Sequence, residues 1–249
     1  MIKLENVVLA SPEQMEFIIE GMRNPMNSWE KSNSGYGCDS GLCSGHCAFS
    51  PEWCGNTQRY VLGENDHSLM QRLAKAGTDH RKFMRMMPVY VRITAPLYWW
   101  KEFDTYKVGT VANSCSTMHK IQAKEFTVDD FSCDHLTKST MKLFNESIRE
   151  LNFWKDAFNC KSDEERNLYF ANSGWNDTYI PTKKECWWQM IQLLPSSYNQ
   201  TRNVMLNYEV LANIYHSRRN HKLDEWREFC KWIETLPYSE LITVEENYI

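Results

Sequence analysis

A strand that runs directly into a proline-started aromatic helix, followed by a loop of small residues, constrains the fold of this chain most. Residues 89–94 alternate and are rich in β-branched side chains, which predicts a strand. The sequence TAPLYWWKEF then predicts a helical turn that begins at a proline. The loop that follows ends in small residues whose backbone N–H groups and hydroxyls can meet a phosphate or a base edge. An ordinary turn has the same composition, so both interpretations stay open on the residues alone. The loop ends in Asn113, Ser114, Cys115 and Ser116.

The length and composition indicate one globular domain over residues 1–249. The chain is long enough to bury a sizeable core, and its 42% hydrophobic and 24% charged residues are globular values. Its ten tryptophans suit a protein that stacks flat rings, although bulky core packing gives the same excess. The net charge of −4, without a run of Lys or Arg, argues against a general nucleic-acid binder.

The hydropathy pattern gives no sign of a membrane segment. No apolar stretch approaches the roughly 18 residues that a membrane span needs, and the N-terminus lacks the apolar region of a signal peptide. We therefore expect no membrane contact and a cytoplasmic location.

The nine cysteines fall into two groups. An odd number without a secretory signal argues against a disulfide framework, so we expect the five scattered ones to be buried or free thiols. The other four lie on a Gly/Ser-rich segment, at about residues 33–60, that we interpret as an insertion loop. Four thiolates can hold zinc tetrahedrally, but the spacing lacks the paired CxxC of zinc knuckles, so incidental thiols remain the alternative. The candidate ligands are Cys38, Cys43, Cys47 and Cys54.

Helix signals are clearest near the N-terminus. Ser11 is a hydroxyl cap, Pro12 follows in the first turn, and Glu13 lies near the positive end of the helix dipole. Residues 69–76 predict a short helix that Gly77 ends.

The second half of the chain is mostly helical in pattern. Residues 129–157 predict one helix, or two that break near Asp134, and residues 163–182 predict a polar surface connection. The segments CWWQMIQLLP and NYEVLANIYHSRR then predict helices on either side of a strand, TRNVML.

The stretch from Thr94 to Lys120 resembles the signature region of the flavin-dependent thymidylate synthases. In that family a strand runs into Ala-Pro, an aromatic helix, Arg-His-Arg, two further residues, a Ser, and an Asn-Glu-x-Ser-x-Arg-Tyr tail. Ala95, Pro96 and the aromatic helix stand in the same order here. The Arg-His-Arg place is taken by Thr105, Tyr106 and Lys107, the Ser place by Thr110, and the Asn-Glu-x-Ser place, after one extra residue, by Asn113, Ser114, Cys115 and Ser116.

A second region of the chain supports the same resemblance. Pro195, Asn207, Asn213 and Arg218 keep the intervals of the family's C-terminal third, and the predicted helix around residues 225–229 follows after one extra residue. The resemblance covers about residues 11–30 and 66–235. Two regions that match in the same order argue against a chance match.

The resemblance implies an α+β fold with a central, largely antiparallel sheet flanked by helices, and a homotetramer with shared sites. The implied reaction is reductive methylation of dUMP to dTMP, in which methylenetetrahydrofolate gives the carbon, FAD carries the hydride and NADPH reduces the flavin. A guanidinium near the uracil carbonyl stabilises charge on the ring, and Arg218 holds that place. The implied cofactor contacts are Thr105, Tyr106, Lys107, Thr110, Asn207 and Asn213, and the implied substrate contacts are Asn113, Ser114, Cys115, Ser116 and Arg219.

Purely structural roles fit some of these residues equally well. Arg218 and Arg219 also suit a solvated helix end, and the two asparagines also suit buried caps. Several family cations are missing, because Lys107 alone keeps a charge in the Arg-His-Arg place, and Met118 and Ile191 stand where nucleotide-binding arginines are expected. The candidates to compensate are Arg81, Lys82, Arg85 and Lys120.

Two functions therefore remain open. The chain is a divergent synthase, or it is a non-catalytic or repurposed nucleotide-binding protein on the same fold. A third interpretation, a small metal-binding module on a helical scaffold, is supported by the cysteine loop alone.

Overall fold

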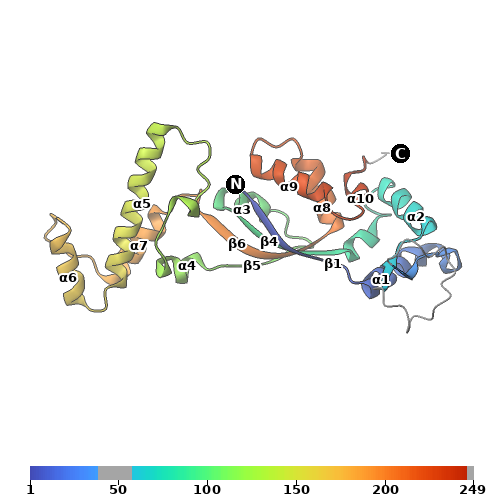
Figure 1. Ribbon diagram of the computed structural model, residues 1–249, viewed down its shortest axis with the longest axis horizontal. Coiled ribbons are helices and arrows are strands. Elements are labelled where there is room, and N and C mark those ends of the chain that lie inside the picture. The colour runs from blue at the N-terminus through green and yellow to red at the C-terminus, as the bar shows by residue number, and fades with distance from the viewer. Residues whose placement is uncertain (39–57, 246–249) are drawn as a thin grey trace. The chain divides into compact units, whose positions relative to one another are not determined.

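The computed structural model describes residues 1–38 and 58–245 (Figure 1). A four-stranded, antiparallel sheet has the strand order β1-β4-β6-β5, and helices surround it. The predicted α+β class with a flanked central sheet is confirmed. The strands are β1 (Lys3–Leu9), β4 (Pro88–Pro96), β5 (Val111–Ser114) and β6 (Asn199–Asn207).

The strand and aromatic helix predicted from the sequence are both present. In β4, Val89, Val91 and Ile93 are buried while the residues between them face outward, which is the alternation of a sheet with one covered face. Helix α3 (Leu97–Phe103) follows at once and buries Trp99, Trp100 and Phe103. Core packing therefore accounts for a good part of the aromatic excess.

The small-residue loop is shorter than predicted. Residues 111–114 form the edge strand β5, so Asn113 and Ser114 belong to a ladder rather than to a loop. Ser116 caps the short helix α4 (Thr117–Lys120), where its hydroxyl accepts a hydrogen bond from the backbone N–H of His119 at 3.0 Å. Part of this run of small polar residues therefore forms a strand and a helix cap rather than a loop.

The chain divides into two compact units. The first contains Met1–Lys3, Ile93–Thr105 and Asn113–Arg202. The second contains Leu4–Arg92, Tyr106–Ala112 and Asn203–Ile249. A single domain over the whole chain stays a prediction.

The first unit carries a helical layer with its own core. Helices α5 (Lys138–Asn159) and α7 (Lys183–Leu193) pack side by side, and α6 (Asp163–Asn172) lies at their end (Figure 1). Residues 129–157 contain one α-helix, which begins after the cap Thr137, and residues Val128–Asp130 before it form only a short 3-10 turn. The predicted polar connection is wrong for its first half, which is α6. That helix buries only Arg166 and Phe170, so its apolar signal is weak. The core contains Leu151, Trp154, Ala157, Phe170, Cys186 and Met190.

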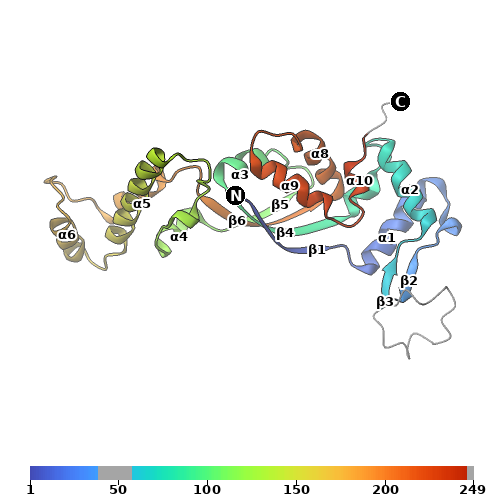
Figure 2. The ribbon, with the colours of Figure 1, turned by 45° about the horizontal axis from the view of Figure 1, so that its top comes forward.

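The second unit contains helices from both the N-terminal and the C-terminal part of the chain. Helix α1 (Pro12–Arg23) begins at the predicted cap, where Ser11 and Gln14 form a capping box. Helix α2 (Glu64–Lys75) starts earlier than predicted, and Gly77 follows it with φ +91°. Helix α8 (Tyr208–Arg218) continues directly from β6, as predicted, and packs against α9 (Asp224–Glu234) and α10 (Glu240–Thr243) (Figure 2). In the described ranges no helix is long and apolar enough to cross a membrane.

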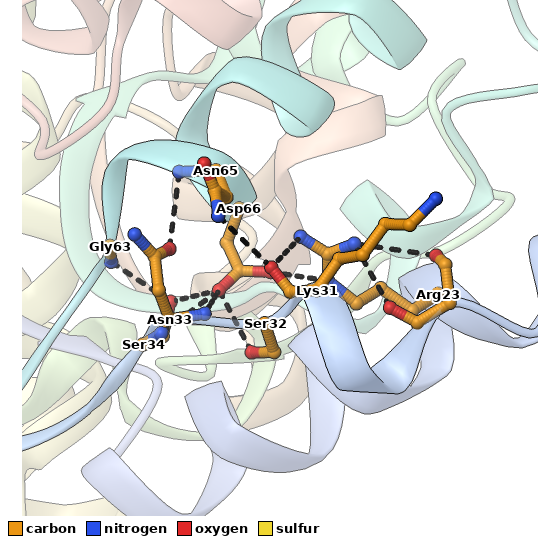
Figure 3. Close-up of polar contacts among 9 residues, drawn as sticks. Arg23, Lys31, Ser32, Asn33, Ser34, Gly63, Asn65 and Asp66 are labelled. Carbon is orange, nitrogen blue, oxygen red and sulfur yellow. Dashed lines mark hydrogen bonds and ion pairs between the residues drawn. The ribbon is translucent and has the colours of Figure 1, made fainter.

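A buried carboxylate fixes the base of the cysteine-rich insertion (Figure 3). Asp66, fully buried in α2, accepts hydrogen bonds from Arg23 Nε at 2.5 Å and from the Ser34 hydroxyl at 2.6 Å. It also accepts from the Ser32 hydroxyl at 2.9 Å and from the backbone N–H groups of Asn33 and Ser34. Burial opposes ionisation of Asp66, but these hydrogen bonds outweigh it and lower the pKa of the carboxyl below its usual value.

Two short strands continue from this base. β2 (Gly35–Cys38) pairs antiparallel with β3 (Gln58–Val61), and Tyr36 lies opposite Tyr60. The predicted zinc ligands Cys43, Cys47 and Cys54 lie outside the described residues.

Candidate functional site

The centre of the second unit's candidate site is a contact between Tyr106 and Arg218. Arg218 Nε donates a hydrogen bond to the Tyr106 hydroxyl at 2.9 Å. The guanidinium carbon lies 5.0 Å from the ring centre of Trp226 and 5.7 Å from that of Tyr106. These distances are typical of cation–π contacts. Two aromatic rings and one hydroxyl therefore orient the charge of the last residue in α8.

Gly109 brings the loop of residues 106–110 against the start of α8. Its φ is +79°, and a Cβ there would lie 3.0 Å from Asn207 Nδ2 and 3.0 Å from Val210 Cγ2. Only glycine permits this close approach in this backbone conformation. Asn207 Oδ1 accepts from the Val210 N–H at 3.0 Å and so caps α8. Asn207 therefore acts as a helix cap, which was the alternative role considered for it. Its amide nitrogen also faces the loop.

Arg81 and Asn213 form a second polar group in this unit. Arg81 is 2% exposed, and its Nε donates to Glu209 Oε2 at 2.7 Å. Its Nη2 donates to Asn213 Oδ1 at 3.4 Å. Burial and pairing with Glu209 give Arg81 a structural role, and its compensation for a missing ligand-binding arginine stays a prediction. The side chains of Lys82, Arg85 and Lys120 are exposed.

Other predicted residues have local partners. Arg219 forms an ion pair with Glu245 at 2.7 Å. The Thr105 hydroxyl donates to the Glu102 carbonyl at 2.7 Å at the end of α3, and the Thr110 hydroxyl donates to the Tyr106 carbonyl. Lys107 is exposed on the same loop, next to Val108, which is 92% exposed. The loop thus presents Lys107 to solvent while its own hydroxyls hold its shape.

The first unit contains a cavity of about 690 Å³ beside two predicted substrate residues, Cys115 and Ser116. This volume lies within the roughly 300–1,000 Å³ of small-molecule sites. The backbone of Cys115 is held by two hydrogen bonds, because its N–H donates to the Thr201 carbonyl at 2.9 Å and the Gln200 side-chain Nε2 donates to the Cys115 carbonyl at 2.9 Å. Asn113 and Ser114 are not among the lining residues.

The charges in this cavity are balanced. Lys124 pairs with Asp130, and this hydrogen bond raises the pKa of the lysine. The N-terminal amine lies 3.2 Å from Asp134 Oδ2. Sequence reasoning missed these residues, because a lysine and two aspartates in polar segments carry no motif. The remaining charged groups in the lining are Lys3 and Asp129.

The structure brings some predicted residues together and assigns others to separate units. The second unit contains Tyr106, Lys107, Thr110, Asn207, Asn213, Arg218 and Arg219, and the first contains Thr105, Asn113, Ser114, Cys115 and Ser116. A single pocket lined by both sets stays a prediction. The zinc site also stays a prediction, because Cys38 is the one of its four ligands that lies in the described ranges. Within those ranges, no group of three or more His, Cys, Asp or Glu could hold a metal ion.

The scattered cysteines are free, as expected. Cys160, Cys186 and Cys230 are buried, and burial raises the pKa of Cys186 to about 11 and that of Cys230 to about 12. These thiols behave as small core residues.

Comparison with solved structures identifies the fold. It is similar to that of the flavin-dependent thymidylate synthase ThyX from Helicobacter pylori complexed with FAD and dUMP, with a TM-score of 0.54 and 13% identity over 97% of each chain. A second structure of that enzyme with FAD and dUMP gives a TM-score of 0.52 and 14% identity over 96% of this chain and 94% of that one. No family model matches the sequence, and no curated protein is similar to it. The chain therefore has a fold similar to that of these synthases at low sequence identity.

Proposed function

We propose that this protein is a divergent flavin-dependent thymidylate synthase that methylates dUMP reductively to dTMP. The observation that carries the proposal is the contact between Tyr106 and Arg218. These two residues come from the two separate regions whose motifs resemble the family, and the fold makes them neighbours. The proposed co-substrates are methylenetetrahydrofolate and NADPH, and the proposed assembly is a homotetramer.

Lys107 supports FAD binding, because an exposed cation can meet the phosphates of the cofactor. Gly109 gives the loop a close approach to α8 that a side chain would block, and Lys107 is an exposed cation next to it. We assign Thr105, Tyr106, Lys107, Thr110, Asn207 and Asn213 to FAD binding. When bound, the reduced flavin supplies the hydride of the reaction.

Arg218 has the principal role in the proposed chemistry. The rings of Tyr106 and Trp226 restrict its guanidinium before any ligand arrives, so little conformational entropy is lost when it meets the substrate. A positive charge fixed near a uracil carbonyl stabilises negative charge that develops on the ring. Arg219, which the structure pairs with Glu245, would act from the rim.

The first unit offers a place for the nucleotide. We assign Asn113, Ser114, Cys115 and Ser116 to dUMP, with the cavity at Cys115 and Ser116 taking part of it. Lys3 lines that cavity and would supply positive charge that Met118 cannot, whereas Lys124 is already paired with Asp130.

A non-catalytic nucleotide-binding protein on the same fold is the second candidate. It is favoured by the local use of Asn207 as a helix cap, of Arg81 in a buried ion pair and of Arg219 in a surface ion pair. Such a protein would keep a nucleotide site and lose flavin chemistry.

Purification and titration test the proposal. We expect a yellow protein with flavin absorbance that retains FAD through gel filtration and binds dUMP more tightly when FAD is present. A colourless protein that takes up no FAD but binds dUMP would favour the second candidate. Light scattering should give four chains per particle, and a monodisperse monomer would count against a shared site.

A further inference from the structure

Two adjacent cavities in the second unit lie among residues to which the proposed reaction gives no role. The first has a volume of about 210 Å³ and the second about 290 Å³. Tyr60 and Tyr238 line both, so the two spaces share these walls. The other lining residues of the first cavity come from the end of β1, α1, the start of β4 and the start of α8.

The first cavity is lined mainly by apolar surface. Its walls combine three tyrosine rings with proline and methionine side chains, among them Met15 and Met87. Tyr208 is 3% exposed, and its hydroxyl donates to the Pro237 carbonyl at 2.5 Å, which fixes its ring as a wall. Tyrosine rings and thioether sulfurs both favour contact with an aromatic ring.

The size of this cavity suits a small ring system. An engineered apolar cavity of about 150 Å³ in another protein takes up benzene. A cavity of 210 Å³ is therefore suited to one ring or to two fused rings.

The second cavity adds a polar wall. Its lining consists of Tyr60, Val61, Leu62, His67 and Tyr238. His67 Nε2 lies 2.6 Å from Glu240 Oε1, and the His67 ring is 5.9 Å from that of Tyr238. A short polar substituent on a ring in the first cavity would meet this histidine.

Tyr238 occupies an unusual backbone position at this junction. Its φ of +56° lies in the left-handed region, which costs a residue with a Cβ free energy. The strained conformation places its side chain in the lining of both cavities.

We propose that these two cavities form a binding site for a flat aromatic ring, of one or two fused rings, that carries a short hydroxyl-type substituent. The ring occupies the apolar space between Tyr60, Tyr208 and Met15, and the substituent points toward His67. The site is independent of the proposed synthase reaction, and its ligand is a small molecule rather than FAD or a nucleotide.

Titration of the full chain with indole and 5-hydroxyindole, followed by ligand-observed NMR, tests this site. Both should bind the native protein, with 5-hydroxyindole bound more tightly, and cyclohexanol should bind much more weakly because it lacks an aromatic face. Ala10→Phe adds a ring at the wall of the first cavity without deleting a contact, and should abolish binding of both indoles. If neither indole binds, or if Ala10→Phe leaves their affinity unchanged, the proposal fails.

Two further variants test the aromatic wall and the polar wall of the site separately. Tyr60→Ala should weaken binding by about tenfold, the upper value for loss of one aromatic contact. Tyr36→Ala is its matched control, because Tyr36 pairs with Tyr60 across the two strands, is 49% exposed and lies outside both linings. Equal weakening in both variants would indicate a general effect on the strands and contradict the site. His67→Ala should remove the preference for 5-hydroxyindole over indole, and an unchanged preference would refute the polar half.

Discussion

Arg218 Nε donates a hydrogen bond to the hydroxyl of Tyr106 at 2.9 Å, across 112 positions of sequence. The contact joins the last turn of α8 to the loop that follows α3 in the chain. The sequence predicts that both residues serve one site. Because they are far apart in the sequence, only the folded chain brings them into contact. The guanidinium is thereby oriented by a hydroxyl and two rings rather than by solvent.

Removal of the Arg218 guanidinium should affect turnover more than cofactor content. For Arg218→Ala we expect turnover of dUMP to fall by about 100- to 1,000-fold, the usual effect of deleting one group that stabilises transition-state charge. The FAD content of the purified variant should stay near the native value. Steady-state kinetics and the flavin-to-protein absorbance ratio measure the two effects separately.

Tyr106→Phe is the matched control for that variant. It keeps the ring beside Arg218 and removes only the hydroxyl that accepts the hydrogen bond. Since one hydrogen bond contributes about 0.5–1.5 kcal/mol, the loss in turnover should be about tenfold or less. A loss as large as that of Arg218→Ala would contradict the assignment of the charge itself to the reaction.

Lys107→Ala should mainly weaken flavin binding. A cation at a phosphate acts equally in the ground state and the transition state, so its removal raises the Kd for FAD and leaves turnover at saturating FAD nearly unchanged. Fluorescence titration of the apoprotein with FAD measures this. Lys101→Ala, an exposed lysine on α3, is the control and should bind FAD normally. Equal Kd values for FAD in native protein and Lys107→Ala would remove Lys107 from the site.

Asp66→Asn should destabilise the protein strongly. The change leaves Arg23, a buried cation, without its carboxylate, and breaking such a pair costs about 3–5 kcal/mol. Chemical denaturation at pH 7 measures the free energy of unfolding. The control is Asp224→Asn, since the Asp224–Arg227 pair is partly exposed and its loss should cost about 1 kcal/mol or less.

The pH dependence of that effect has a defined sign. The pKa of Asp66 is lowered in the folded state, so its contribution is complete above the unfolded pKa of about 3.9 and is lost as the pH falls through the folded value. The difference in unfolding free energy between native protein and Asp66→Asn should therefore shrink below about pH 4. A difference that stays constant from pH 7 to pH 3 would contradict an ionised, hydrogen-bonded Asp66.

Zinc in the cysteine loop stays a prediction with a direct test. If Cys38, Cys43, Cys47 and Cys54 bind the ion, elemental analysis should find close to one zinc per chain. Serine substitution at Cys43 should then release the metal and make the insertion sensitive to protease while the remaining fold persists. Metal-free protein in which all four thiols react with iodoacetamide would end this hypothesis.

The sequence predicted the elements whose residues repeat with a clear period. The strand β4 and the start of α1 follow from alternation and from capping at Ser11, which act locally. Helix α6 was not predicted, because only two of its residues are buried and the apolar residues therefore show no clear helical period. The split of residues 105–116 between strand, cap and loop also escaped, since small residues permit all three.

The candidate site was less predictable than the fold. The sequence predicted one helix for Asn207 and Arg218 and left a capping role for Asn207 open, and the structure has Asn207 as the cap of α8 and Arg218 as its last residue. The sequence could not show that Glu209 neutralises Arg81. Those roles depend on side chains that meet only after folding. The cavity beside Cys115 is lined by residues from separate parts of the chain, such as Lys3, Asp130 and Gln200, which have no motif and become neighbours through tertiary structure.

Release of tritium from 5-tritiated dUMP tests the central claim most directly. The assay contains native protein, FAD, NADPH and methylenetetrahydrofolate, with Arg218→Ala as the control variant. We predict release of tritium to water that requires all three additions and falls steeply in the variant. A native protein that binds no flavin and releases no tritium would contradict the synthase and leave the nucleotide-binding protein in its place.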